Sequence, residues 1–110
     1  MLDLRTASGL WLVLSSSQTI YRLDLDRHLL RREPGTGSSR DAFDDAWVPL
    51  VHVEVLVDGG RTAVTSTITV GRRHLYLTDP MGGGADYRWW LQRTAERIAP
   101  VAAGAPPVEP

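Results

Sequence analysis

Valine occupies every second position over residues 51–57, and this alternation constrains the fold more than any other feature of the chain. Strict alternation of apolar with other residues is typical of a β-strand that buries one face. Turn-forming residues at 58–61 and at 71–72 bracket the next segment, which is rich in β-branched residues. Three antiparallel strands are therefore predicted over residues 47–78.

Pairing these three strands through the two turns separates their side chains into an apolar face and a polar face. The apolar face collects Val51, Val53, Val55, Val57, Val64, Ile68, Val70, Leu75 and Leu77. The polar face collects His52, Glu54, Thr65, Thr67, Thr69, His74, Tyr76 and Thr78. The apolar face needs a cover, whereas the polar face of an antiparallel sheet is free to meet solvent.

A second set of three strands is predicted over residues 10–33. Pairing Leu14 with Thr19 across a polar turn defines a core face: Leu10, Leu12, Leu14, Tyr21, Leu23 and Leu25. Trp11 then lies on the outer face. The third strand follows a turn at residues 26–29, and its register adds two cross-strand pairs of opposite charge: Asp24 with Arg31, and Arg22 with Glu33.

The C-terminal segment shows helical periodicity. Asp86 is suited to cap a helix, and apolar residues then recur at helical spacing: Tyr87, Trp90, Leu91, Ala95 and Ile98. Pro100 would end this helix, and the Pro- and Ala-rich tail over residues 100–110 is expected to be disordered. The predicted fold is α+β, with residues 1–99 as a single domain. It is an antiparallel sheet of about six strands, two three-stranded meanders, with the C-terminal helix packed on its apolar face.

The residue totals argue against several function classes. The chain has 110 residues and no cysteine, so a disulfide scaffold, a thiolate nucleophile and a cysteine-ligated zinc are excluded. Its formal net charge is −1, which argues against a nucleic-acid partner because such domains usually carry a basic excess. The histidines at positions 28, 52 and 74 are too scattered to predict a metal site. We expect neither a metal nor a cofactor.

All 12 basic residues are arginine, and both lysine and asparagine are absent. A GC-rich genome explains this bias, because the codons for lysine and asparagine are A-rich, and it suggests an actinobacterial or actinobacteriophage source. No segment has the pattern of a signal peptide, and the longest apolar run, residues 10–14, is too short to span a membrane. We therefore expect a cytoplasmic protein without a membrane partner.

The N-terminal third carries three short sequence motifs in a fixed order. These are Trp11-Leu12-Val13, then Asp24-Leu25-Asp26 within a hairpin, then Arg32-Glu33-Pro34-Gly35. This W-x-V, DLD, R-x-P-G pattern resembles one found in small uncharacterised proteins of actinobacteria and their phages, and it covers about a quarter of the chain. The resemblance implies no catalytic residues, and it makes an accessory or mobile-element role more plausible.

One group of residues could support catalysis. His52, Glu54 and His74 share the predicted polar face, and Arg72 lies at the adjacent turn. A glutamate base, a histidine acid and an arginine that neutralises phosphate are the minimal set for acid–base cleavage of RNA, so a small ribonuclease-like phosphodiesterase is one alternative. The same threonine-rich face could also form the polar floor of a small-ligand site. A plain solvent-facing surface explains these residue types better than either alternative.

Tryptophan and arginine dominate the energetics of protein interfaces, and they supply the candidate partner-binding residues. These residues are Trp11, Arg88, Trp89 and Arg93. The leading hypothesis is a small non-enzymatic protein that binds a protein partner, with self-association as a homodimer. The helix over residues 86–99 or an open sheet edge would carry the contact.

Overall fold

The computed structural model describes residues 1–36, 43–79 and 88–101. The predicted α+β class is wrong, because these ranges contain no α-helix, only the short 3-10 turn η1 (Asp58–Gly60). The strands are β1 (Leu2–Asp3), β2 (Leu10–Ser15), β3 (Ile20–Asp24), β4 (Leu29–Glu33), β5 (Trp47–Leu56), β6 (Thr62–Thr65), β7 (Thr67–Ile68), β8 (His74–Thr78), β9 (Arg88–Leu91) and β10 (Ala95–Val101).

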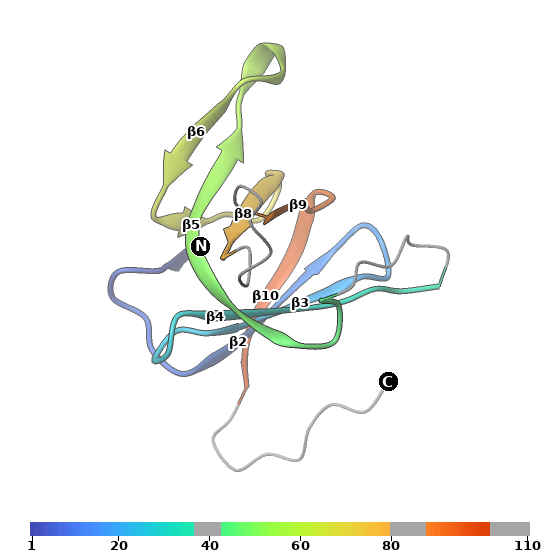
Figure 1. Cartoon of the computed structure of the whole chain (residues 1–110). Helices are drawn as coiled ribbons and strands as arrows, with labels where there is room; N and C mark the ends of the chain where they lie inside the picture. The colour runs from blue at the N-terminus through green and yellow to red at the C-terminus, as the bar shows by residue number, and fades with distance from the viewer. Residues whose placement is uncertain (37–42, 80–87, 102–110) are drawn as a thin grey trace.

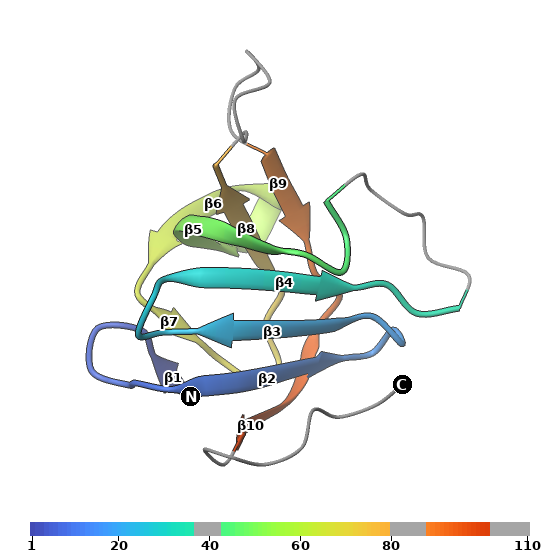
Figure 2. The ribbon, with the colours of Figure 1, turned by 60° about the horizontal axis from the view of Figure 1, so that its bottom comes forward.

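Eight of these strands form one antiparallel sheet in the order β10-β2-β3-β4-β5-β8-β9, with β6 added to β5. The strands at the two ends of this order, β9 and β10, follow one another in the chain and are separated only by residues 92–94. The sheet therefore curls until its two margins approach each other, as Figure 2 shows. This curvature encloses the core between parts of one sheet, so no helix is needed to cover an apolar face.

Strand β5 is the branch point of the sheet. Its first part pairs with β4, and its last part pairs with β6 along the same edge, while β8 pairs along the opposite edge. The predicted meander, with residues 62–70 as its central strand, is therefore wrong: β8 lies beside β5 and not beside β6. The β5–β6 hairpin projects from the rest of the molecule (Figure 1).

Two one-residue differences in register reverse the predicted faces. Leu14 pairs with Ile20 and not with Thr19, which turns Trp11 and Val13 toward the core and turns Leu10 outward. A one-residue shift has this effect because side chains alternate between the two faces of a strand. In contrast, the pairing of β3 with β4 differs from the prediction by two residues, which preserves the predicted face of β3.

The same error affects the second set of strands. Val53 pairs with Thr65 on β6 and with Tyr76 on β8, so Val53 and Tyr76 share the inner face. His52 and Glu54 lie on the outer face with Leu75 and Leu77. The predicted division into a valine face and a threonine-rich face is therefore wrong, because each face mixes the two sets.

The core is centred on two stacked tyrosines. The rings of Tyr21 and Tyr76 lie 4.8 Å apart with an interplanar angle of 24°. The Tyr76 hydroxyl donates to Gln92 Oε1 at 2.6 Å, and Gln92 Nε2 donates to the Val13 carbonyl at 3.3 Å. The surrounding buried residues are Leu2, Val13, Leu23, Leu25, Leu30, Val48, Val53, Ile68, Trp90 and Ala95. A buried glutamine thus links β8 to β2 across the closed side of the sheet.

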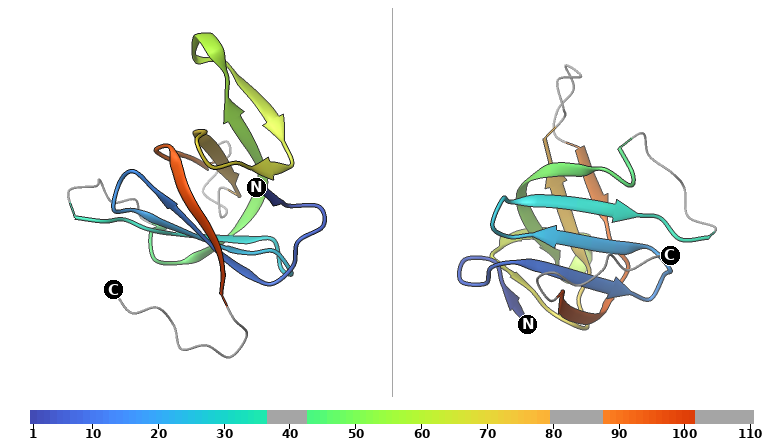
Figure 3. Two further views of the ribbon diagram at one scale, coloured as in Figure 1. Left: turned by 180° about the vertical axis from the view of Figure 1, so that it is seen from behind. Right: turned by 90° about the horizontal axis from the view of Figure 1, so that it is seen from below.

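The predicted helix over residues 86–99 is replaced by β9 and β10. Its inward residues come from two strands, with Trp90 on β9 and Ala95 and Ile98 on β10. The register of β10 shifts between Ala95 and Arg97, so Glu96 is an extra residue. This β-bulge lets residues three apart both face the core, which imitates helical spacing in the sequence. Figure 3 shows β10, in orange, running from the turn after β9 along the margin of the sheet.

The last strand also contradicts two smaller expectations. Pro100 lies within β10, opposite Trp11, and does not end the preceding element. Proline is tolerated there because β10 is a margin strand, where a missing amide need not break the ladder. Residues 102–110 of the predicted disordered tail lie outside the described residues.

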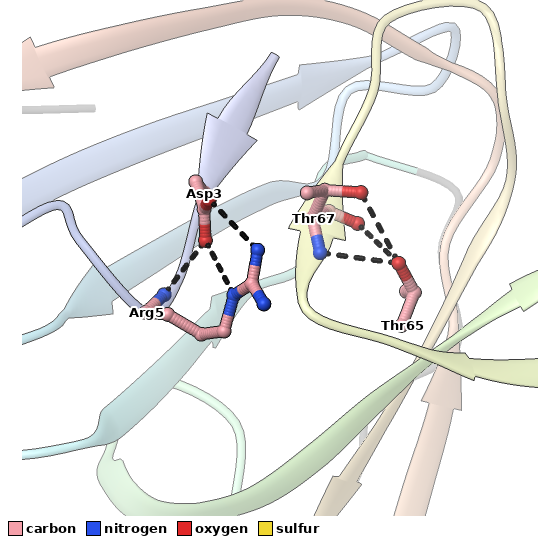
Figure 4. Close-up of polar contacts among 4 residues, drawn as sticks. All are labelled: Asp3, Arg5, Thr65 and Thr67. Atoms are coloured by element: carbon pink, nitrogen blue, oxygen red, sulfur yellow. Dashed lines mark hydrogen bonds and ion pairs between the residues drawn. The ribbon is translucent and has the colours of Figure 1, made fainter.

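A second, two-stranded sheet holds the N-terminus against the core. Leu2 pairs with Ile68 and Asp3 with Thr67, and both apolar side chains are buried. The Asp3 carboxylate accepts from Arg5, and the Thr65 hydroxyl contacts the Thr67 hydroxyl at 3.1 Å beside it (Figure 4). The contact between Thr65 and Thr67 spans the bend between β6 and β7, where the chain leaves the β5–β6 hairpin and returns to the body of the protein.

Candidate interaction surface

Two of the four candidate catalytic residues lie together on the outer face of β5. His52 Nε2 is 2.9 Å from Glu54 Oε2, and the Thr62 hydroxyl donates to Glu54 Oε1 at 2.6 Å. The hydrogen bond from Thr62, reinforced by His52, holds the pKa of Glu54 below its ordinary value. This carboxylate therefore stays ionised and bridges two neighbours, which makes it a weak base for catalysis.

The third candidate, His74, lies on the opposite side of the sheet. It pairs with Val55, whose side chain shares the inner face with Val53, and it is fully buried. Burial, with a smaller effect of the Arg72 charge, lowers the pKa of His74 to about 4. His74 is therefore neutral at physiological pH, and the sheet separates it from His52 and Glu54.

Arg72 is exposed in the loop that precedes β8, and its Nη2 lies 3.5 Å from the Leu56 carbonyl. The structure thus brings together His52 and Glu54 but does not assemble the four-residue set that the ribonuclease alternative requires. The polar floor required by the small-ligand alternative is divided as well, because Tyr76 and Thr78 are buried in the core.

The candidate partner-binding residues lie in different environments. Trp11 faces inward, packs against the core and donates from Nε1 to the Ser8 carbonyl at 2.9 Å. Trp89 lies on the outer face of β9 and is 64% exposed. Arg88 precedes it in β9, and Arg93 is exposed just after this strand. Trp89 therefore remains available as an interface anchor, and Trp11 does not.

Trp89 lies on the outer side of the sheet over β6, β5, β8 and β9, which we call the outer face. The apolar side chains on β8 and β9 form one part of this face, and the His52–Glu54 pair on β5 separates them from β6. Leu77 lies opposite Trp89, and Leu75 lies opposite Leu91, which is 47% exposed. Two exposed valines also lie on the outer face: Val51, the extra residue of a bulge in β5, and Val64 on β6, opposite Glu54. The alternating pattern had assigned Val51, Val64, Leu75 and Leu77 to the core. Leu75 is indeed buried, although on the outer side of β8, whereas Val51 and Val64 are exposed, because alternation does not reveal which face is buried.

Strand β9 forms a margin of the sheet. In the described part of the chain it pairs only with β8, so one row of its backbone amides and carbonyls has no strand beside it. Such an edge is a template for pairing with another strand. Its outer side chains, Trp89 and Leu91, would flank any strand that paired there.

No group of three or more His, Cys, Asp or Glu side chains in ranges 1–36, 43–79 and 88–101 is placed to hold a metal ion. Among these same residues there is no helix long and apolar enough to cross a membrane. Comparison with protein-family models, with curated proteins and with solved structures finds no match for this chain.

Proposed function

We propose that this chain is a small non-enzymatic binding protein that forms a homodimer through strand β9. The observation that carries the proposal is the exposure of Trp89 on an edge strand, next to the apolar residues Leu77 and Leu91. A large aromatic side chain is costly to leave in water, and tryptophan is among the residues that most often anchor interfaces.

Pairing of two β9 strands around a two-fold axis suits this sequence. With the axis at Trp90, Trp89 of each copy lies opposite Leu91 of the other, because opposed residues of an antiparallel pair share a face. The contact is then apolar on the outer face and supplied equally by both copies. It also satisfies the free amides and carbonyls of both edges, which a flat apolar contact would leave exposed.

The outer face broadens this contact. Leu77 on β8 lies beside Trp89 and is half-buried, so a strand added to β9 would continue the apolar surface of Leu77, Trp89 and Leu91 across the dimer. A four-residue strand alone is short for a stable interface, and the adjoining side chains supply the additional buried area.

Analytical ultracentrifugation between 1 µM and 1 mM tests the proposal. The wild-type chain should show a reversible monomer–dimer equilibrium, and Trp89→Ala should weaken dimerisation at least tenfold, a typical effect for an interface tryptophan. Trp47→Ala is the matched control, because Trp47 is also exposed but lies on β5 where it pairs with β4. Circular dichroism establishes that both variants fold.

A monomer throughout this range would exclude the homodimer. Equal weakening by the two variants would exclude β9 as the contact.

A further inference from the structure

The arginines of this protein fall into two groups with different surroundings. Each arginine described in the first half of the chain is ion-paired with a carboxylate: Arg5, Arg22, Arg27, Arg31 and Arg32. The arginines of the second half whose side chains are described form no ion pair with a described residue: Arg61, Arg72, Arg73, Arg93 and Arg97. The charges of the second group are therefore available to an external anion.

Three of these arginines, Arg72, Arg73 and Arg93, lie in two backbone segments that run side by side. Residues 71–74 run beside residues 92–95, joined by the amide of Ala95 to the Arg72 carbonyl at 2.9 Å and by the amide of Gln92 to the His74 carbonyl at 2.9 Å. Arg73 Nε also donates to the Gln92 carbonyl at 3.2 Å. Arg72 Nη2 donates to the Leu56 carbonyl at 3.5 Å. Arg72, Arg73 and Arg93 thus lie on neighbouring stretches of backbone, and we call these three residues the arginine cluster.

The surroundings of the arginine cluster leave its charge largely uncompensated. Glu96, at the bulge of β10, is the acidic residue nearest to Arg93 in the sequence. It forms no ion pair with a described residue. Arg72 and Arg93 are exposed, and Arg73 is half-buried with its Nε already bound to a carbonyl. Guanidinium groups in such a setting bind carboxylates or phosphates through paired N–H donors.

We propose that the arginine cluster is a docking site for an acidic segment of a protein partner. The positive charge of three neighbouring arginines is sufficient to bind a short peptide segment with several carboxylates. Nucleic acid is a poorer fit, because its binding depends on neutralising many phosphates, and the whole chain has 13 acidic residues against 12 arginines. This site lies beyond the β9 contact of the homodimer and gives the protein a second binding surface.

Fluorescence anisotropy with a labelled peptide of eight glutamates tests the site, with a peptide of eight glutamines as the uncharged reference. Wild-type protein should bind the glutamate peptide alone, and more weakly at 200 mM than at 20 mM NaCl. The double variant Arg72→Gln/Arg93→Gln should weaken binding at least tenfold. Arg73 is left unchanged because its side chain holds the backbone of Gln92.

The matched control is Arg5→Gln/Arg27→Gln, which removes the same charge from exposed arginines that are already paired. It should retain wild-type affinity, and an equal loss in both double variants would overturn the assignment of a specific site. Tighter binding of a single-stranded oligonucleotide than of the glutamate peptide, at equal salt, would overturn the acidic-protein assignment. Trp89→Ala should keep full peptide affinity, which separates this inference from the homodimer.

Discussion

Acidification should destabilise the fold through His74. The imidazole is fully buried, and its Nε2 accepts a hydrogen bond from the Thr69 amide at 3.2 Å. Protonation would place a hydrogen on this accepting nitrogen and a second positive charge near Arg72. Burial, together with the Arg72 charge, therefore lowers the pKa of His74 from 6.5 to about 4.

The size and sign of the effect follow from the difference in pKa between the two states. Between about pH 6.5 and about pH 4 the unfolded chain carries a proton on His74 and the folded protein does not. The free energy of unfolding therefore falls as the pH falls through this window, at ~1.4 kcal/mol per unit. The total loss is about 3 kcal/mol once the pH is below 4, a large share of the ~5–15 kcal/mol typical of a domain. Above pH 6.5 His74 contributes no pH dependence.

Urea denaturation, followed by tryptophan fluorescence from pH 7.5 to 4.5, measures this loss. His74→Gln keeps an acceptor for the Thr69 amide but removes the titration, so its stability should fall by about 2–3 kcal/mol less than that of the wild type over this range. His28→Asn is the control, because His28 is exposed and its positive φ of 57° suits asparagine. Its pH profile should match that of the wild type. Parallel profiles for the wild type and His74→Gln would refute the role of His74.

Three further predictions concern other contacts. Tyr76→Phe should lower the free energy of unfolding by about 1–3 kcal/mol in urea denaturation, because it leaves the buried Gln92 Oε1 without its 2.6 Å donor; an unchanged midpoint would contradict this. Gly35→Ala should destabilise by about 1–3 kcal/mol, because the new Cβ would lie 2.3 Å from Gln18 Cβ and 2.6 Å from the Gln18 carbonyl carbon; wild-type thermal stability would show that the contact relaxes freely. Thr62→Val should raise the pKa of Glu54 toward its ordinary value in an NMR titration, whereas Thr65→Val should leave it unchanged, because Thr65 bonds to Thr67.

The strands could be recognised in the sequence because their signals are local. Alternation and β-branched residues mark β5 and β8, and the glycine pair at residues 59–60 marks the turn after β5. Both glycines have positive φ, which glycine adopts without strain. Each of these signals depends on residues close together in the chain, so no tertiary contact was needed to read them.

The faces of the strands could not be read in the same way. A register difference of one residue between β2 and β3 exchanged the inward and outward sides of β2, and bulges at Val51 and Glu96 changed the phase of alternation within β5 and β10. Neither bulge has a glycine or proline to mark it. The position of His74, on which the catalytic hypothesis depended, followed from this undetermined parity.

The sequence by itself determined that residues 10–33 and 47–78 form antiparallel strands, and it singled out Trp89 as an interface candidate. Only the tertiary structure decided that the segment after residue 87 forms β9 and β10, because those strands are stabilised by pairing with β8 and β2, which are distant in the chain. The same closure placed Trp89 on an open edge and brought the backbone of Arg72 and Arg73 beside residues 92–95, which include Arg93. Strand formation is largely a local property, whereas strand partners and exposed faces depend on how the whole sheet encloses its core.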